Sequence, residues 1–205
     1  MKKLLIATTN PGKLSEIKFF LQDLPLELVS LADLEIKDQP EETGQTFEEN
    51  AVLKAKFYAK ISGLPTLADD GGLEIDALNG EPGVKSRRWI NGLESSDEEL
   101  INYTLEKLKG VPLEKRGTQI RGAIALVFPD GKVYISVGEV RGIIAEKAYS
   151  KREAGFPFRS LLYLPELKKF YCYSDLTLEE QQQYNHRDKM LKKLKPIIYE
   201  YVILG

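Results

Sequence analysis

Cysteine and histidine are almost absent from this chain: its 205 residues include one of each, Cys172 and His186. A single cysteine cannot form a disulfide within the chain, and such scarcity is typical of proteins from a reducing compartment. A single histidine excludes a zinc site built from several histidines of one chain. No Ser-His-Asp or Cys-His arrangement for nucleophilic catalysis can be read from the sequence either.

An excess of positive charge is also lacking, because 31 acidic residues stand against 29 lysines and arginines. General nucleic-acid binders usually carry a basic excess, so we expect no nucleic-acid partner. No apolar run approaches the roughly 18 residues that a membrane span needs, and the run at residues 4–7 is too short for a signal peptide. We therefore expect a cytoplasmic protein that does not bind a membrane.

The chain does contain enough apolar material for a core. Hydrophobic residues make up 42% of the sequence, and its length suits one domain or two tightly joined lobes. Short apolar or alternating runs predict strands, and Asp130-Gly131 between two of them predicts a hairpin turn. The predicted strands are residues 3–7, 65–68, 73–77, 120–128, 132–137 and 138–145.

Helices are predicted between these strands. The second helix ends near Gly63 and the third at Gly110, since glycine commonly terminates a helix. The last helix begins at Asn185, and Pro196 should kink or interrupt it. The first three starts are marked by Asn10 with Pro11, Thr46 with Glu49, and Ser95 with Glu98. Helices mixed with buried and alternating strands favour an α/β sheet protein.

The first group of residues suited to chemistry is the segment 8–13, at a predicted strand-to-helix junction. Free backbone N–H groups at a helix start, the positive end of the helix dipole and Lys13 suit a phosphate group. Asn10, Pro11 and Gly12 are equally typical of a turn that binds nothing. On these residues alone, a phosphate site and plain turn chemistry both stay open.

The second group is acidic: Glu41 and Glu42, and Asp69 and Asp70 after a predicted buried strand. Mg²⁺ prefers oxygen ligands and typically takes one or two carboxylates together with substrate phosphates and water. The glutamate pair alone is equally well explained as a solvated loop. The aspartate pair is harder to explain so, because ligand crevices form at strand ends in open sheets. Side chains alternate along a strand, so one aspartate is expected to face the site.

The third group combines cations with aromatic residues. Asn50 and Lys54 are one helical turn apart and share a face of the second helix. His186 and Arg187 lie near the start of the last helix, where a structural role is the common alternative to catalysis. The aromatic residues within 156–163 are core by default, although an aromatic ring beside a loop can also stack on a base.

Three segments together resemble the inosine/xanthosine triphosphate pyrophosphatase family, which removes non-standard purine nucleotides from the nucleotide pool. They are TTNPGK at 8–13, EETGQTFEENA at 41–51 and ADDGGLEIDALNGEPGV at 68–84, in the order in which the family has them. The resemblance extends over nearly the whole chain and is most specific in its first half.

This resemblance implies a fold and a reaction. The fold is α/β, with an elongated central mixed sheet flanked by helices, and residues 1–205 form one domain of two lobes with the substrate cleft between them. The reaction is the Mg²⁺-dependent hydrolysis of inosine, deoxyinosine or xanthosine triphosphate (ITP, dITP or XTP) to the monophosphate and pyrophosphate. Members of the family are usually homodimers.

The resemblance also implies roles for single residues. Asp70 would accept the proton of the attacking water and, with Glu41 or its neighbour Glu42, hold the metal. Lys13 would act on the triphosphate, which agrees with the need of phosphoryl chemistry for positioning and charge neutralisation. Substrate contacts would come from Thr8, Thr9, Asn10, Pro11, Gly12, Lys13, Lys54, Gly71, Phe156, Pro157, Phe158, Arg159, Gln181, His186 and Arg187.

Three positions depart from the family pattern. Gly71 stands where the family usually has Ser or Thr, Arg159 where it has Asp, and Gln181 where it has Lys. The last two lie near the expected base pocket, where one unmatched polar group changes selectivity by orders of magnitude. The hypothesis is that the pyrophosphatase chemistry is kept while base selection is altered. The alternatives are the same chemistry on another modified nucleotide, and a nucleotide-binding protein with little turnover.

Overall fold

Strands β1 (Lys3–Ile6), β2 (Glu27–Ser30) and β3 (Thr66–Ile75) pair in parallel in a computed structural model that describes residues 2–204. The remaining strands are β4 (Gly117–Val127), β5 (Val133–Ile144), β6 (Leu162–Leu164) and β7 (Lys169–Phe170). All seven form one sheet in the order β2-β1-β3-β4-β5-β6-β7. Because β6 pairs antiparallel with both β5 and β7, the sheet is mixed and the predicted α/β class is confirmed.

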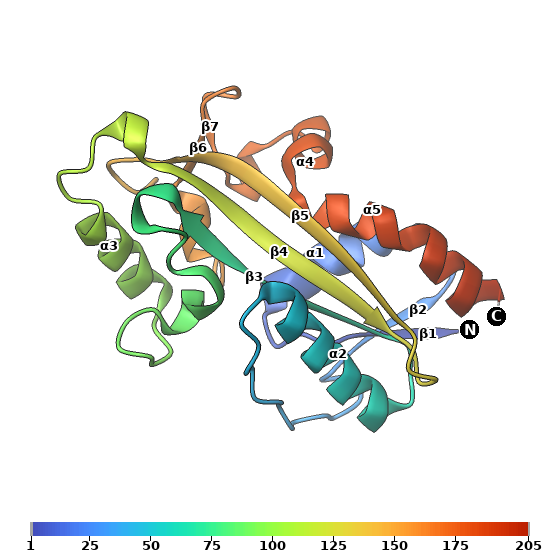
Figure 1. Ribbon diagram of the computed structural model, residues 1–205. Coiled ribbons are helices and arrows are strands. Elements are labelled where there is room, and N and C mark those ends of the chain that lie inside the picture. The colour runs from blue at the N-terminus through green and yellow to red at the C-terminus, as the bar shows by residue number, and fades with distance from the viewer. Residues whose placement is uncertain (1, 205) are drawn as a thin grey trace. The chain divides into compact units, whose positions relative to one another are not determined.

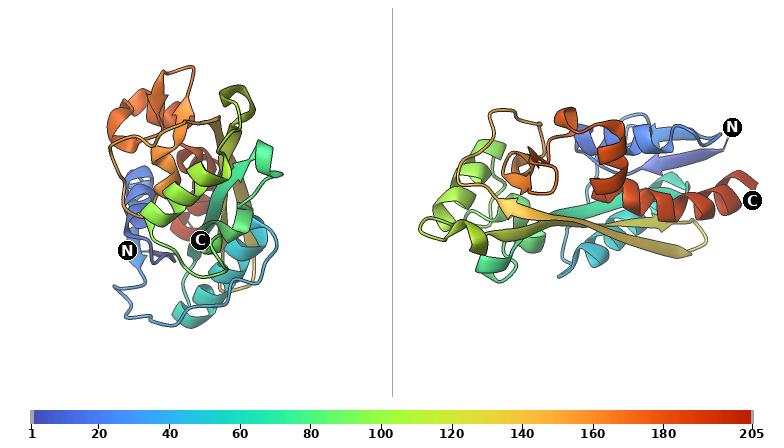
Figure 2. Two further views of the ribbon diagram at one scale, coloured as in Figure 1. Left: turned by 90° about the vertical axis from the view of Figure 1, so that its left-hand side faces the viewer. Right: turned by 90° about the horizontal axis from the view of Figure 1, so that it is seen from above.

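The chain divides into two compact units. Unit 1 holds the residues up to Asp70, residues 122–138 and the residues from Arg187 onward, and unit 2 holds Gly71–Arg121 and Glu139–His186. In unit 1, α2 lies on one face of the parallel strands and α5 on the other (Figure 1; Figure 2). The helices are α1 (Pro11–Leu21), α2 (Phe47–Ser62), α3 (Asp97–Lys107), α4 (Leu178–Tyr184) and α5 (His186–Ile198).

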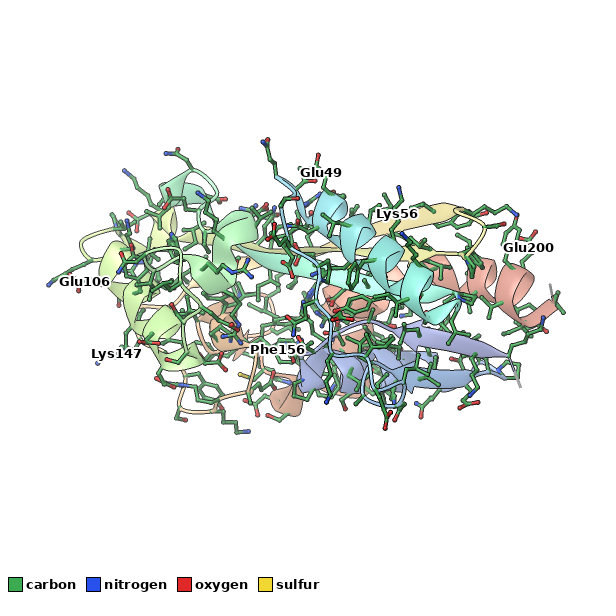
Figure 3. The ribbon with its side chains drawn as sticks, turned by 90° about the horizontal axis from the view of Figure 1, so that it is seen from below. Glu49, Lys56, Glu106, Lys147, Phe156 and Glu200 are labelled. Carbon is green, nitrogen blue, oxygen red and sulfur yellow. The ribbon has the colours of Figure 1, made fainter. Side chains whose placement is uncertain are left out.

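The predicted caps set the bounds of the first two helices. Asn10 caps α1, and Thr46 with Glu49 forms the capping box of α2. Gly63 ends α2 at a φ of 67°, a left-handed conformation that glycine adopts without a Cβ clash. Figure 3 shows Glu49 at the start of α2 and Lys56 on its exposed side, which leaves the opposite side of the helix to the sheet.

The two strands predicted around the Asp-Asp-Gly-Gly segment are one strand, because β3 runs through it without a break. Asp69 and Asp70 do not end the strand, since each carboxylate has polar partners while the backbone stays extended. Gly72 allows the strand to lie against the turn that carries Ser86. A Cβ at Gly72 would lie 2.1 Å from Ser86 Oγ and 2.7 Å from the carbonyl oxygen of Gly83.

Several boundaries in the second half also differ from prediction. The cap of α3 is Ser96 with Glu99, one residue later than expected. Residues 76–78 form a 3-10 turn after β3, and β5 is one strand where two were predicted. Pro196 lies inside α5, and the α-helical pattern gives way to a π-helix at Tyr199. Proline has no N–H to donate, so it weakens the α-helical pattern without ending the helix at that point.

Four short elements, β2, β6, β7 and α4, were not predicted at all. The four residues of β2 are too few to show a period, so its assignment depends on pairing with β1. The seven-residue α4 does carry a local signal, the capping box of Thr177 with Glu180. That box marks its start in the same way as the boxes of α2 and α3.

Each unit has its own apolar interior. In unit 1, the side chains of β1 from Leu4 to Ile6 are fully buried, as are Ala51 and Ala55 of α2. In unit 2, one cluster gathers residues of β3, α3, β5, β6 and the segment around Phe158. Within residues 2–204, no helix combines the length and the apolar composition that crossing a bilayer requires.

We expect Thr46→Ala to lower the free energy of unfolding by about 1 kcal/mol, because α2 loses the side-chain oxygen that accepts from the N–H of Glu49. Thr46→Ser keeps that oxygen and should remain close to the wild type. Urea denaturation of the three proteins measures the difference. Equal stability of the alanine and serine variants would contradict a contribution from the capping hydrogen bond.

Candidate active site

The parallel register of β1 and β3 brings two of the predicted groups together. Ile6 pairs with Leu67, and the N–H of Ala7 donates to the carbonyl of Leu67 at 2.7 Å. The loop after β1 therefore leaves the sheet at the level where β3 reaches Asp69 and Asp70. The two segments meet because the carboxyl ends of parallel strands lie at the same edge of a sheet.

The loop at 8–13 caps its own helix. The Thr8 hydroxyl oxygen accepts from the N–H of Asn10 at 3.2 Å, and Asn10 Oδ1 accepts from the N–H groups of Gly12 and Lys13 at 2.9 and 3.2 Å. Two of the N–H groups expected to be free for a phosphate therefore have a partner within the loop, which corrects that expectation. The half-buried side chain of Lys13 is the cation that this segment contributes. Its two exposed residues are Thr9 and Pro11.

Asp69 is the centre of a group of buried ion pairs on one face of β3. Its Oδ2 accepts from Nη2 and Nε of Arg187 at 2.9 and 3.2 Å, and its Oδ1 lies 3.2 Å from Nζ of Lys13. Arg187 also donates to Glu16 of α1. The side chains of Asp69 and Arg187 are only 2% and 4% exposed. Burial of charge at this level is tolerated because each ion is paired and hydrogen-bonded.

Asp70 turns the other way, toward α2, as alternation along a strand requires. Its Oδ1 accepts from Nζ of Lys54 at 3.0 Å and its Oδ2 from Nδ2 of Asn50 at 3.2 Å. Asn50 Oδ1 also accepts from the N–H of Gly44 at 2.8 Å, so one amide ties the acidic loop to β3. Glu42 Oε1 from that loop lies 3.4 Å from Nζ of Lys54.

The neighbouring aspartates have pKa values displaced in opposite directions. Burial alone would raise the pKa of Asp69, but Lys13, Arg187 and Lys54 outweigh burial and hold that pKa well below its ordinary value. Burial raises the pKa of Asp70 above its ordinary value, against the attraction of Lys54 and Lys13. Asp69 is therefore a fixed negative charge, and Asp70 is the carboxylate better suited to accept a proton.

The oxygen atoms around Lys54 suit a divalent cation. The carboxylates of Asp70 and Glu42 converge on one ammonium nitrogen, so they already meet around a positive charge. Mg²⁺ held jointly by protein and substrate needs only one or two carboxylates, which these supply. A cluster of three or more acidic, histidine or cysteine ligands does not occur within residues 2–204. Glu41, the expected metal ligand, is exposed, and its role stays a prediction.

In unit 2, Arg159 is the centre of the segment expected to contact a base. Its guanidinium lies 3.9 Å from the ring centroid of the half-buried Phe156, and its Nη1 donates to Glu153 Oε2 at 2.9 Å. Phe158 packs into the core of the unit, and Pro157 is also buried. The default interpretation of these aromatics as core therefore holds for Phe158, whose position gives no support to a substrate contact.

The two other expected base contacts of unit 2 lie around α4 and the start of α5. His186 is buried, and its Nδ1 lies 3.0 Å from the hydroxyl oxygen of Tyr171. Gln181 is buried as well, and its amide nitrogen donates to the carbonyls of Tyr173 and Leu176 at 3.0 and 3.1 Å. The amide that replaces the family lysine therefore holds the preceding backbone.

The structure thus brings together Lys13, Lys54, Asp70 and Arg187 within unit 1, and Gly71 follows Asp70 as the next residue of β3. Two further residues contact this group: Glu16 accepts from Arg187, and Asn50 donates to Asp70. Helical spacing could have indicated both, because Glu16 follows Lys13 by three positions and Asn50 precedes Lys54 by four. No sequence signal marks the remaining supporting residues, which are Glu153 and Tyr171.

We expect Arg187→Met to lower the free energy of unfolding by about 3–5 kcal/mol, because it leaves the carboxylates of Asp69 and Glu16 buried without their shared cation. Lys195→Met, on the same helix, removes an ion pair with the exposed carboxylate of Asp23; it is the matched control and should change stability by less than about 1 kcal/mol. Urea denaturation at neutral pH measures both. Similar values for the two variants would contradict a central role for the Arg187 ion pairs.

Comparison with known proteins finds relatives that match nearly the whole chain. A dITP/XTP pyrophosphatase of Thermus thermophilus is 42% identical over 192 residues, which span 94% of this chain and 89% of that protein. A dITP/XTP pyrophosphatase of Geobacter sulfurreducens is 43% identical over 195 residues, 95% of this chain and 96% of that protein. The solved structure of a HAM1 protein from Coxiella burnetii superposes with a TM-score of 0.82 at 34% identity, over 98% and 100% of the two chains.

The family with which residues 4–197 agree is the Ham1 family. The match covers almost the full length of the chain, and the similar proteins share both its sequence and its fold. The resemblance expected from the three motifs is confirmed, and the chain belongs to the Ham1 family.

Proposed function

We propose that this protein is a Mg²⁺-dependent nucleoside triphosphate pyrophosphatase that converts non-standard purine nucleoside triphosphates (ITP, dITP and XTP) to the monophosphate and pyrophosphate. The observation that carries the proposal is the pair Asp69 and Asp70 of β3, of which Asp69 meets Lys13 and Arg187 and Asp70 meets Lys54. The names of the similar proteins, dITP/XTP pyrophosphatases, support the same reaction.

In this mechanism the residues of unit 1 act on the phosphates and the water. Lys13 and Lys54 bind the negatively charged phosphate oxygens, and Asp70 takes a proton from the attacking water. The water oxygen bonds to the α-phosphorus while the bond from that phosphorus to the bridging oxygen breaks, so pyrophosphate leaves. Mg²⁺, held by Asp70 with Glu41 or Glu42, would neutralise charge on the phosphates. Asp69 keeps Lys13 in place.

The residues of unit 2 are proposed to recognise the base. Phe156 supplies an aromatic face and His186 a hydrogen-bonding ring. Arg159 and Gln181 are engaged with Glu153 and with backbone carbonyls, respectively, and they stand where the family has Asp and Lys. The same chemistry on another modified nucleotide is therefore the second candidate.

The placement of substrate between two lobes of one domain stays a prediction, as does the cytoplasmic location.

The first experiment is a substrate panel on the purified protein with Mg²⁺, with pyrophosphate and orthophosphate measured separately. We expect pyrophosphate from ITP, dITP or XTP in preference to the standard triphosphates. Pyrophosphate release that favours another modified nucleotide would support the second candidate. No hydrolysis of any substrate would leave a nucleotide-binding protein with little turnover.

We expect Asp70→Asn to lower kcat by about 10²- to 10⁴-fold, the usual contribution of a positioned proton acceptor, while nucleotide binding remains measurable by calorimetry. Asp130→Asn makes the same chemical change at an exposed turn and should leave kcat unchanged. Full turnover by the Asp70 variant would contradict the mechanism. Equal loss in both variants would indicate an effect unrelated to the site.

We also propose that the protein forms a homodimer through the exposed apolar side chains of unit 1. Ile135 and Val137 of β5 are 48% and 39% exposed, and Tyr199 beyond α5 is 48% exposed. Ile135 and Val137 are two positions apart and therefore point to the same face of β5, and neighbouring exposed apolar side chains are typical of protein interfaces. Ile135→Glu should shift the mass measured by light scattering from dimer to monomer, whereas Lys132→Glu at the nearby hairpin turn should not. A monomeric wild-type protein would refute the proposal.

A further inference from the structure

A chain of contacts in unit 2 leads from the partly buried carboxylate of Glu153 to the only histidine, His186. Glu153 holds the guanidinium of Arg159, which lies over two aromatic rings, at 3.9 Å from the centroid of Phe156 and 5.3 Å from that of Tyr171. The hydroxyl oxygen of Tyr171 then lies 3.0 Å from Nδ1 of His186. One cation therefore supports both the ring expected to stack on a base and the tyrosine that contacts the histidine.

The inner part of this chain is almost completely buried. Tyr171, Arg159 and His186 are 2%, 3% and 4% exposed. A hydrogen bond between two buried rings is geometrically restrictive, because neither side chain can turn without leaving a polar atom unsatisfied. Tyr171 therefore restrains the orientation of the imidazole ring of His186.

We propose that Tyr171 is a positioning residue that determines base selectivity. Its hydroxyl donates to Nδ1 of His186, which keeps the imidazole proton on Nε2 and makes Nε2–H the donor to the 6-oxo group of a purine. The inference rests on the proposed function, in which His186 meets the base. A neutral imidazole carries one proton, and the hydrogen bond made by one ring nitrogen decides which nitrogen holds it.

Gln181 and Arg159, which stand where the family has Lys and Asp, explain why selectivity would depend on the Nε2–H donor of His186. Both amide hydrogens of Gln181 are directed to the carbonyls of Tyr173 and Leu176, so this side chain offers no N–H to a base. These hydrogen bonds also hold the backbone just after Tyr171. Arg159 covers one face of Phe156, so a base can stack only on the other face of that ring.

The test compares ITP with purine riboside triphosphate, which lacks the 6-oxo group and the N1 proton that accompanies it. We expect Tyr171→Phe to lower kcat/KM for ITP by about three- to tenfold, the effect of one hydrogen bond, and to leave the value for purine riboside triphosphate unchanged. Tyr184→Phe removes a hydroxyl that donates to Glu166 at 2.6 Å in the same unit. This matched control should leave the ratio between the two substrates unchanged.

His186→Ala separates the inference from the function on which it rests. His186→Ala should abolish the preference for ITP over purine riboside triphosphate. Adding Tyr171→Phe to that variant should then have no further effect, because both changes remove the same interaction. If His186→Ala abolishes the preference and Tyr171→Phe leaves it intact, the inference is overturned while the proposed base contact holds. If His186→Ala leaves the preference intact, the base contact itself is wrong. An equal loss on both substrates in Tyr171→Phe would show a structural role and overturn the inference.

A spectroscopic measurement tests the same assignment without any variant. Because His186 is the only histidine, ¹⁵N NMR of the labelled protein shows one pair of imidazole nitrogens. At a pH where the ring is neutral, we expect the proton on Nε2 and an acceptor at Nδ1. A proton on Nδ1 would overturn the proposal, since Tyr171 would then be the acceptor and Nε2 could not donate to the base.

Discussion

Two carboxylates that follow one another in a buried strand set the requirements for the rest of unit 1. Side chains alternate along β3, so Asp69 and Asp70 point to opposite faces and cannot share one set of partners. Unpaired charges at this depth would be strongly destabilising, so each face must supply its own cation. Arg187 meets Asp69 and Lys54 meets Asp70, from helices on opposite faces of the sheet (Figure 1).

This arrangement separates two tasks that one carboxylate could not combine. The cations around Asp69 lower its pKa and keep its carboxylate ionised. Asp69 therefore keeps its ion pair with Lys13. Asp70 has a raised pKa and lies beside the acidic loop that Asn50 ties to β3, so it is the carboxylate proposed to accept a proton. In unit 2 a buried cation also holds its neighbours in place. The guanidinium of Arg159, at the position where the family has an acidic residue, lies over the rings of Phe156 and Tyr171.

The sequence predicted correctly those helices whose start and end are both marked by nearby residues. The α2 helix starts and ends where Thr46, Glu49 and Gly63 predict, because capping depends on residues within one turn. The break predicted in β3 was wrong. Glycines and paired aspartates usually indicate a turn, but here contacts with residues distant in the sequence keep the segment extended. The short β2 could not be predicted, because its strand conformation depends on pairing with β1.

The sequence by itself determined the family, the helix-capping loop at 8–13 and the acidic pairs, because these depend on residue types at fixed spacing along the chain. Only the tertiary structure decided what each charged group does. It placed Arg187 against Asp69 and Glu16, brought Glu42 close to Lys54, and directed the amide of Gln181 to backbone carbonyls. The physical reason is that the state of a buried ion is set by its neighbours in space, and these come from segments that are far apart in the chain.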